Sequence, residues 1–134
     1  MIELPRGSWW DWDVVSWDQG RLVLAAGHDL TYHHGLELHF DEPELVACPA
    51  AFHDPVFHAP TAAETARARN QLGAAPPLLV AFTADAGGSE PADGLIAAGG
   101  LRIVEGLVFR YWREELRPGE RHAPWVRPVG AAGE

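Results

Sequence analysis

The feature that most constrains the fold is the alternation of apolar and polar residues from position 30 to position 41. One set of alternate positions holds Leu30, Tyr32, His34, Leu36, Leu38 and Phe40, and the other holds Thr31, His33, Gly35, Glu37, His39 and Asp41. Side chains alternate between the two faces of a β-strand. The segment therefore predicts an antiparallel strand with the first set on the core and the second facing water. Gly35 is where so long a strand is expected to bulge or bend.

Shorter strand-forming segments lie on both sides of this one. β-Branched and aromatic residues favour strands, and clusters of Gly, Pro and Asp mark the turns between them. The strands predicted in this way span residues 9–17, 21–26, 44–48, 78–83, 95–98 and 101–113. Residues 9–48 are therefore expected to form a four-strand meander, whereas the proline-rich segment 49–60 is expected to be irregular.

A single helix is predicted after the proline-rich segment. Thr61 and Glu64 form a capping-box pattern at the start of an alanine-rich stretch. Gly73 stands where a glycine commonly ends a helix, and Pro76-Pro77 prevents continuation. The helix is expected to span residues 61–72.

The spacing of these segments favours a mainly β fold with a minor helical part. The chain of 134 residues fits one domain over residues 1–134, with 128–134 expected to be a frayed tail. The antiparallel meander can form a β-sandwich, a half-open barrel or a curved sheet with the helix on it. The sequence does not predict the strand order.

Composition narrows the classes of partner and compartment. The formal net charge is −9, and residues 1–66 carry eleven acidic and two basic side chains. Such a surface repels phosphate backbones, so nucleic acid is not an expected partner. No apolar run is long enough for a membrane span, and the first residues do not resemble a signal peptide, which predicts a cytoplasmic protein. All ten basic residues are arginine, a bias typical of GC-rich bacterial genomes.

Six of the seven histidines lie between residues 28 and 58, which indicates metal or acid–base chemistry. The candidate metal ligands are His33, Glu37 and His39 on the polar face of the long strand, with His53 and His58 in the proline-rich segment. Nitrogen and oxygen donors of this kind suit a divalent transition metal such as zinc. The alternative is a solvated polar face without a cofactor, since no standard zinc spacing is present. His34, on the apolar face, is predicted to be a hydrogen-bonded core or interface histidine.

One short segment resembles a motif of the cupins, which are double-sheet metal-binding barrels. It is Pro118-Gly119-Glu120-Arg121-His122, which is similar to the histidine-containing second cupin motif. The first cupin motif needs His-x-His followed by glutamate, and this chain has His33-His34 followed by Glu37 instead. The resemblance covers five residues and implies a metal site that includes His122.

The tryptophans indicate a binding surface instead of a catalytic site. Trp and Arg are enriched in binding hot spots. The candidate interaction residues are Trp9, Trp10, Trp12, Trp17, Arg110 and Trp112. In a regular strand Trp10 and Trp12 would share one face and Trp9 and Trp17 the other. Aromatic residues on both faces predict a homodimer or a contact with another protein.

Two hypotheses for function follow from these patterns. The chain contains neither a GxSxG elbow nor a phosphate-binding glycine loop. The leading hypothesis is therefore a small binding or interaction module without enzymatic activity. The alternative is a metal-binding protein or a small metal-dependent, cupin-like enzyme that uses the His/Glu cluster.

Overall fold

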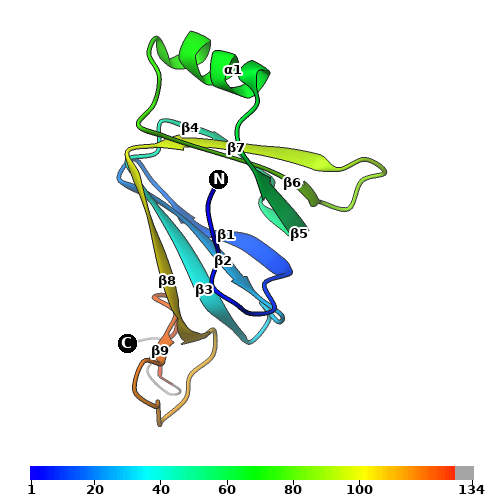
Figure 1. Ribbon diagram of the computed structural model, residues 1–134. Helices are drawn as coiled ribbons and strands as arrows, with labels where there is room; N and C mark the ends of the chain where they lie inside the picture. The colour runs from blue at the N-terminus through cyan, green and yellow to red at the C-terminus, as the bar shows by residue number, and fades with distance from the viewer. Residues whose placement is uncertain (129–134) are drawn as a thin grey trace.

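The computed structural model describes residues 1–128 and consists of one sheet and one helix (Figure 1). The strands are β1 (Asp11–Trp17), β2 (Arg21–Gly27), β3 (His33–Asp41), β4 (Leu45–Ala47), β5 (Ala51–His58), β6 (Leu78–Asp85), β7 (Ala92–Ala98), β8 (Gly100–Phe109) and β9 (Arg121–His122). The helix is α1 (Ala62–Leu72). The predicted mainly β class with one helix is confirmed. Residues 129–134, which make up most of the predicted frayed tail, lie outside the described residues.

The nine strands form a single curved sheet in the order β4-β7-β6-β5-β1-β2-β3-β8-β9. All neighbouring strands are antiparallel except β8 and β9, which are parallel. Figure 1 shows the strands β4, β6 and β7 crossing above β1, β2, β3 and β8. The sheet does not close into a barrel, so of the predicted architectures the curved sheet describes it best.

The core lies on the concave face of this sheet. It contains Leu36, Leu38 and Phe40 of β3, as the alternation predicted. Its aromatic centre consists of Trp12, Phe52 and Phe82, whose rings stack from β1 through β5 to β6. Full burial of a large apolar side chain contributes roughly 1.5–3 kcal/mol. These residues therefore hold the two halves of the sheet together.

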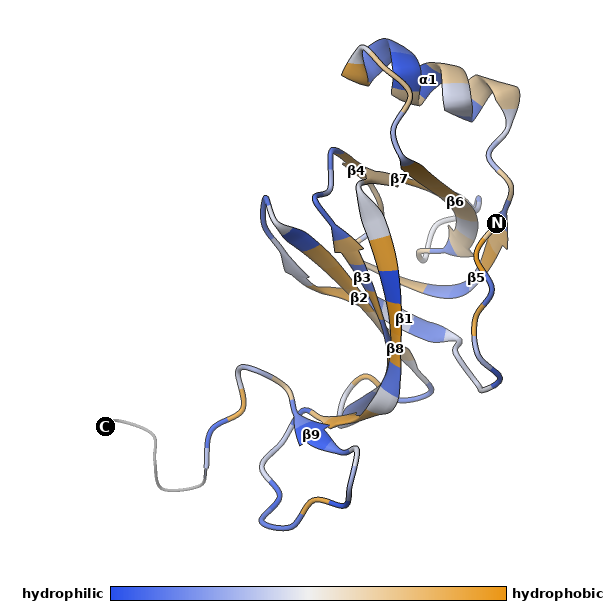
Figure 2. Ribbon diagram, turned by 60° about the vertical axis from the view of Figure 1, so that its left-hand side comes forward, coloured by the Kyte–Doolittle hydropathy of each residue, from blue (hydrophilic) through white to orange (hydrophobic). Residues whose placement is uncertain are grey.

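Helix α1 lies along the outer side of β4, β6 and β7 in both views (Figures 1 and 2). Thr61 is its N-cap, and the reciprocal hydrogen bonds between Thr61 and Glu64 form the predicted capping box. Gly73 ends the helix in the left-handed conformation with φ of 82°, which costs glycine little. Ala68 is the buried residue of the helix. Within residues 1–128, no helix is long and apolar enough to span a bilayer.

Replacing Thr61 with alanine is expected to lower the free energy of unfolding by about 1 kcal/mol. The substitution removes the hydroxyl that accepts a hydrogen bond from the backbone N–H of Glu64 at 3.1 Å. Urea denaturation measures the change, and Thr65→Ala, inside the helix, is the control. An unchanged midpoint for Thr61→Ala would show that the box does not stabilise the fold.

Two predictions about the middle of the chain are wrong. The segment expected to be irregular forms β5, which pairs with both β1 and β6. The register between β5 and β6 shifts between His53 and Val56, which is a β-bulge in β5. Pro55 lies in this bulge, where its missing N–H does not cost a hydrogen bond between the strands. The four-strand meander ends after β3, since β4 pairs with β7 instead of β3. The two-residue strand β9 was not predicted, because so short a strand has no recognisable pattern.

Candidate functional site

Two buried side chains of β3, His34 and Glu37, form the first contact of the site. The register between β3 and β8 shifts between His34 and Leu36, where β8 advances by three residues, from Val108 to Glu105, against two in β3. Beside this irregularity His34 turns to Glu37, and its Nε2 lies 2.7 Å from Glu37 Oε2. The expectation that His34 shares a face with Leu36 is therefore wrong. The expectation that it is a buried, hydrogen-bonded histidine is confirmed.

Glu37 is the centre of the site and is buried, with 5% of its surface exposed. The prediction that its side chain faces water is wrong. His39 Nε2 lies 2.7 Å from its Oε1, and the guanidinium of Arg121 forms an ion pair with the same oxygen. Burial by itself raises the pKa of Glu37, but the hydrogen bonds from His34 and His39 and the charge of Arg121 outweigh it, and the pKa falls from 4.5 to about 2. The carboxylate is thus ionised at neutral pH.

Arg110 extends the cluster toward β1. Its Nε donates to His34 Nδ1 at 3.0 Å, and its two terminal nitrogens donate to the two carboxylate oxygens of Asp13, each at 3.0 Å. Because arginine keeps its protons, His34 Nδ1 must accept and its Nε2–H must donate to Glu37. We call the six side chains Asp13, His34, Glu37, His39, Arg110 and Arg121 the Glu37 network.

His39 has one ring nitrogen in the network and one outside it. Since the ionised Glu37 can only accept, His39 donates through Nε2–H. Its Nδ1 is buried and has no hydrogen-bond partner among the described residues. A reactant approaching from solvent therefore cannot reach this nitrogen without a local rearrangement.

A cavity of about 570 Å³ lies next to the network on the outer face of β1, β2 and β3. Its lining includes Val15, Ser16, Asp18, Arg21, Val23, His34, Glu37, His39, Arg121, Pro124 and Trp125. The last three belong to β9 and the segment after it, which Figure 2 shows beside the far end of β8. The side chain of Arg121 is 43% exposed and Trp125 is 48% exposed. The guanidinium of Arg110 lies 5.7 Å from the Trp125 ring centroid.

The structure brings together only two of the predicted metal ligands, Glu37 and His39. The ring of His33 instead lies against Phe109 and His28. His53 pairs with Asp11 at 3.2 Å, and His58 pairs with Glu64 at 3.1 Å. No group of three or more His, Cys, Asp or Glu within residues 1–128 is arranged to hold a metal ion.

The histidine of the cupin-like segment also lies outside the Glu37 network. His122 Nε2 accepts from the backbone N–H of Arg113 at 3.0 Å. Its ring stacks on Trp112 with the centroids 4.4 Å apart. These contacts give His122 a role in holding the segment that follows β8.

Zinc is expected to leave the melting temperature unchanged. The Nε2–H groups of His34 and His39 point at the carboxylate of Glu37, and Arg121 places a positive charge where a cation would bind. A metal that binds the folded state must raise its stability, so melting curves of tag-free protein in zinc and in chelator provide the measurement. A higher melting temperature in zinc that disappears in His39→Ala would contradict this expectation.

The candidate interaction residues divide between core and surface. Trp12 is fully buried, Trp9 packs against the same core, and the Arg110 side chain is enclosed by Asp13 and His34. Trp10 and Trp17 are exposed. Trp10 and Trp12 therefore do not share a face, because Trp10 precedes the first residue of β1 and lies against His53. The buried residues cannot form an interface, and the homodimer stays a prediction that light scattering can check.

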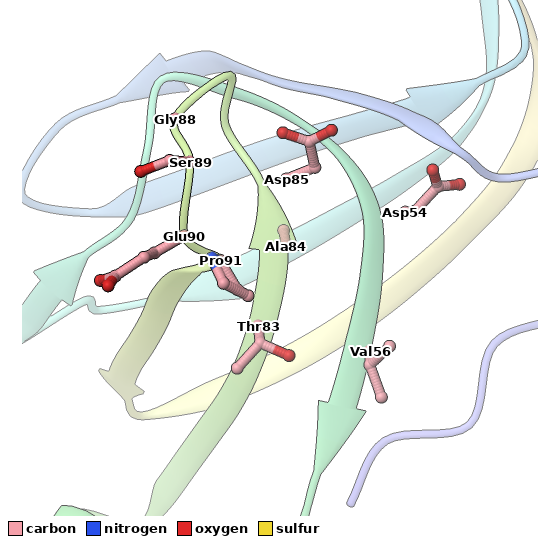
Figure 3. A pocket seen from close by; sticks show the side chains of 9 residues that line it. All are labelled: Asp54, Val56, Thr83, Ala84, Asp85, Gly88, Ser89, Glu90 and Pro91. Atoms are coloured by element: carbon pink, nitrogen blue, oxygen red, sulfur yellow. The ribbon is translucent and has the colours of Figure 1, made fainter.

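A second cavity, of about 380 Å³, lies between β5, β6 and the loop before β7. Figure 3 shows the side chains that line it. Asp54 and Asp85 lie on neighbouring strands, whereas Glu90 points away from both. Asp85 Oδ1 accepts the backbone N–H of Gly87 at 2.8 Å and so stabilises the turn. The three carboxylates do not converge on a common point.

Sequence reasoning missed Asp13, Arg121 and Trp125 as members of the site, and it placed Arg110 on the surface. No local pattern marks them, since the ion pair between Asp13 and Arg110 joins residues 97 positions apart. Cys48 is a half-buried free cysteine, and burial raises the pKa of its thiol to about 12. Comparisons with protein-family models, with curated proteins and with solved structures find no match to this chain.

Proposed function

We propose that this protein is a binding module without enzymatic activity, and that its ligand occupies the cavity beside the Glu37 network. The observation that carries the proposal is that two half-exposed side chains, Arg121 and Trp125, each contact a buried charged group of the Glu37 network. Arg121 is paired with Glu37, and Trp125 lies against the guanidinium of Arg110. Both side chains line the cavity. A rigid cation and a rigid aromatic ring are the groups that recur in binding hot spots.

The energetics of the network support a positioning role. Burying charged groups costs several kcal/mol per ion, and well-packed apolar residues of similar volume often stabilise a fold as well or better. An arrangement of two carboxylates and two guanidiniums is therefore a poor means of stabilising a sheet. It is a good means of holding Arg121 at one place and angle, because both partners are fixed by strands β3 and β9.

The hydrogen-bonding of the network favours binding over proton transfer. Both oxygens of Glu37 accept hydrogen bonds, and both ring nitrogens of His34 are engaged. The remaining nitrogen, His39 Nδ1, is buried. A general acid or base must lie within hydrogen-bond reach of the proton that it transfers. The hydrogen bonds of Glu37, His34 and His39 therefore suit these residues to hold Arg121 and Arg110 in place.

The proposal is tested by titrating ¹⁵N-labelled protein with indole, benzamide and benzoate. We expect at least one probe to shift the amide signals of residues that line the cavity, such as Val15, Ser16 and Val23. Ser16→Trp fills the cavity from an exposed position and should abolish the shifts. Ser89→Trp makes the same change at the exposed rim of the second cavity and should preserve them. Shifts that persist in Ser16→Trp, or no shift from any probe, would contradict the proposal.

A further inference from the structure

The acceptors in the cavity are already occupied by the protein itself. Glu37 receives hydrogen bonds on both oxygens. Asp18 Oδ1 accepts the backbone N–H groups of Gly20 and Arg21 at 2.8 and 2.9 Å. Of the charged oxygens that line the cavity, only the second one of Asp18 has no hydrogen bond from a described residue.

The donors in the cavity are mostly available. Arginine carries five N–H donors, and the ion pair of Arg121 with Glu37 engages one terminal nitrogen. Arg21, at the rim, reaches Asp41 only through Nε at 3.5 Å. Both arginine side chains are nearly half exposed. A ligand therefore meets more free donors than free charged acceptors, and the positively charged donors that remain free are on guanidinium groups.

Guanidinium donors select a particular kind of acceptor. Their planar fork matches the two oxygens of a carboxylate or a phosphate, and such charge-assisted pairs are stronger than hydrogen bonds between neutral groups. Trp125, Val15, Val23 and Pro124 give the lining an apolar and aromatic part, beside Gly20 and the hydroxyl of Ser16. A volume of about 570 Å³ lies within the range of small-molecule sites.

We infer that the ligand of this cavity is a small molecule with an oxyanion, either a carboxylate or a phosphate, joined to an apolar or aromatic body. The oxyanion pairs with Arg121, and the apolar body lies against Trp125. This inference rests on the proposed function. The net charge of −9 disfavours anions at long range, but salt screens that repulsion beyond roughly 8 Å, so the contacts decide the affinity.

The experiment compares three probes that share a phenyl ring on the unaltered protein by NMR titration. Benzoate carries the carboxylate, phenyl phosphate carries the phosphate, and benzamide is the neutral analogue of benzoate. We expect one of the two anions to bind roughly tenfold or more tightly than benzamide, since a hydrogen bond to a charged group is the stronger one. The tighter of the two anions identifies the oxyanion. Equal affinity for benzamide and both anions in the cavity overturns the inference and leaves the binding module standing, whereas no binding overturns both.

Variants locate the contact on the protein. Arg121→Gln should remove the preference for the anion, and Arg121→Lys should restore part of it because the charge is kept without the fork. Arg117→Gln is the matched control, because that side chain is exposed and lies outside the cavity lining. If Arg121→Gln does not fold, Arg21→Gln at the rim should still weaken the anion more than benzamide. An anion preference that survives in both Arg121→Lys and Arg21→Gln unchanged would overturn the assignment to these two arginines.

Discussion

Replacing Glu37 with glutamine is expected to lower the free energy of unfolding at neutral pH by roughly 3 kcal/mol. The substitution removes the charge that faces Arg121 and the Nε2–H groups of His34 and His39. An amide offers one neutral acceptor oxygen in place of two charged ones, and its NH₂ group replaces an oxygen that accepted from these donors. Urea denaturation at pH 7 measures the difference, and Glu115→Gln, at an exposed position, is the control.

The same substitution should make the free energy of unfolding depend less steeply on pH in the acid range. The pKa of Glu37 is about 2 in the folded protein and 4.5 ordinarily, so below about pH 4.5 the unfolded chain binds the proton more tightly. The stability that Glu37 contributes is therefore fully present above pH 4.5 and is lost as the pH falls toward 2. Denaturation midpoints measured across this range should fall less steeply in Glu37→Gln than in the unaltered protein. Parallel curves would show that Glu37 does not carry the acid dependence.

Replacing Trp12 with alanine is expected to cost about 3–5 kcal/mol, the usual range for truncating a large core aromatic. Trp12 is 0% exposed. The centroid of its ring lies 5.9 Å from that of Phe52, on which it stacks, and 5.7 Å from that of Phe57. Its Nε1–H also donates to the carbonyl of Trp9 at 2.6 Å. The variant leaves a cavity at the junction of β1 and β5, where the two halves of the sheet meet.

Trp17 provides the matched control for Trp12, because it has the same side chain at the other end of β1. It is 61% exposed, and Trp17→Ala should change the free energy of unfolding by no more than about 0.5 kcal/mol. Chemical denaturation followed by far-ultraviolet circular dichroism measures both variants. Equal effects of the two substitutions would mean that Trp12 is not at the centre of the core.

The sequence predicted those parts of the fold that depend on neighbouring residues. The core face of β3 follows from alternation, so Leu36, Leu38 and Phe40 could be assigned from their spacing alone. The helix could be assigned because a capping box needs only Thr61 and Glu64, three positions apart. Each of these signals is contained within one element. The pairing partners of β4 and β5 depend on segments distant in the chain, and those were predicted wrongly.

The site depended on tertiary structure for two physical reasons. First, the register between β3 and β8 shifts next to His34, whose side chain meets Glu37 instead of sharing a face with Leu36, and alternation alone cannot show where such a shift falls. Second, the network is completed from distant segments: Arg121 of β9 pairs with Glu37, and Arg110, the residue after β8, joins His34 to Asp13 of β1. The sequence by itself determined a mainly β chain, its single helix and an unusual density of histidine near Glu37. Only the tertiary structure decided that His34 and His39 meet Glu37 in a network with two arginines, because ion pairs form between side chains that folding brings together.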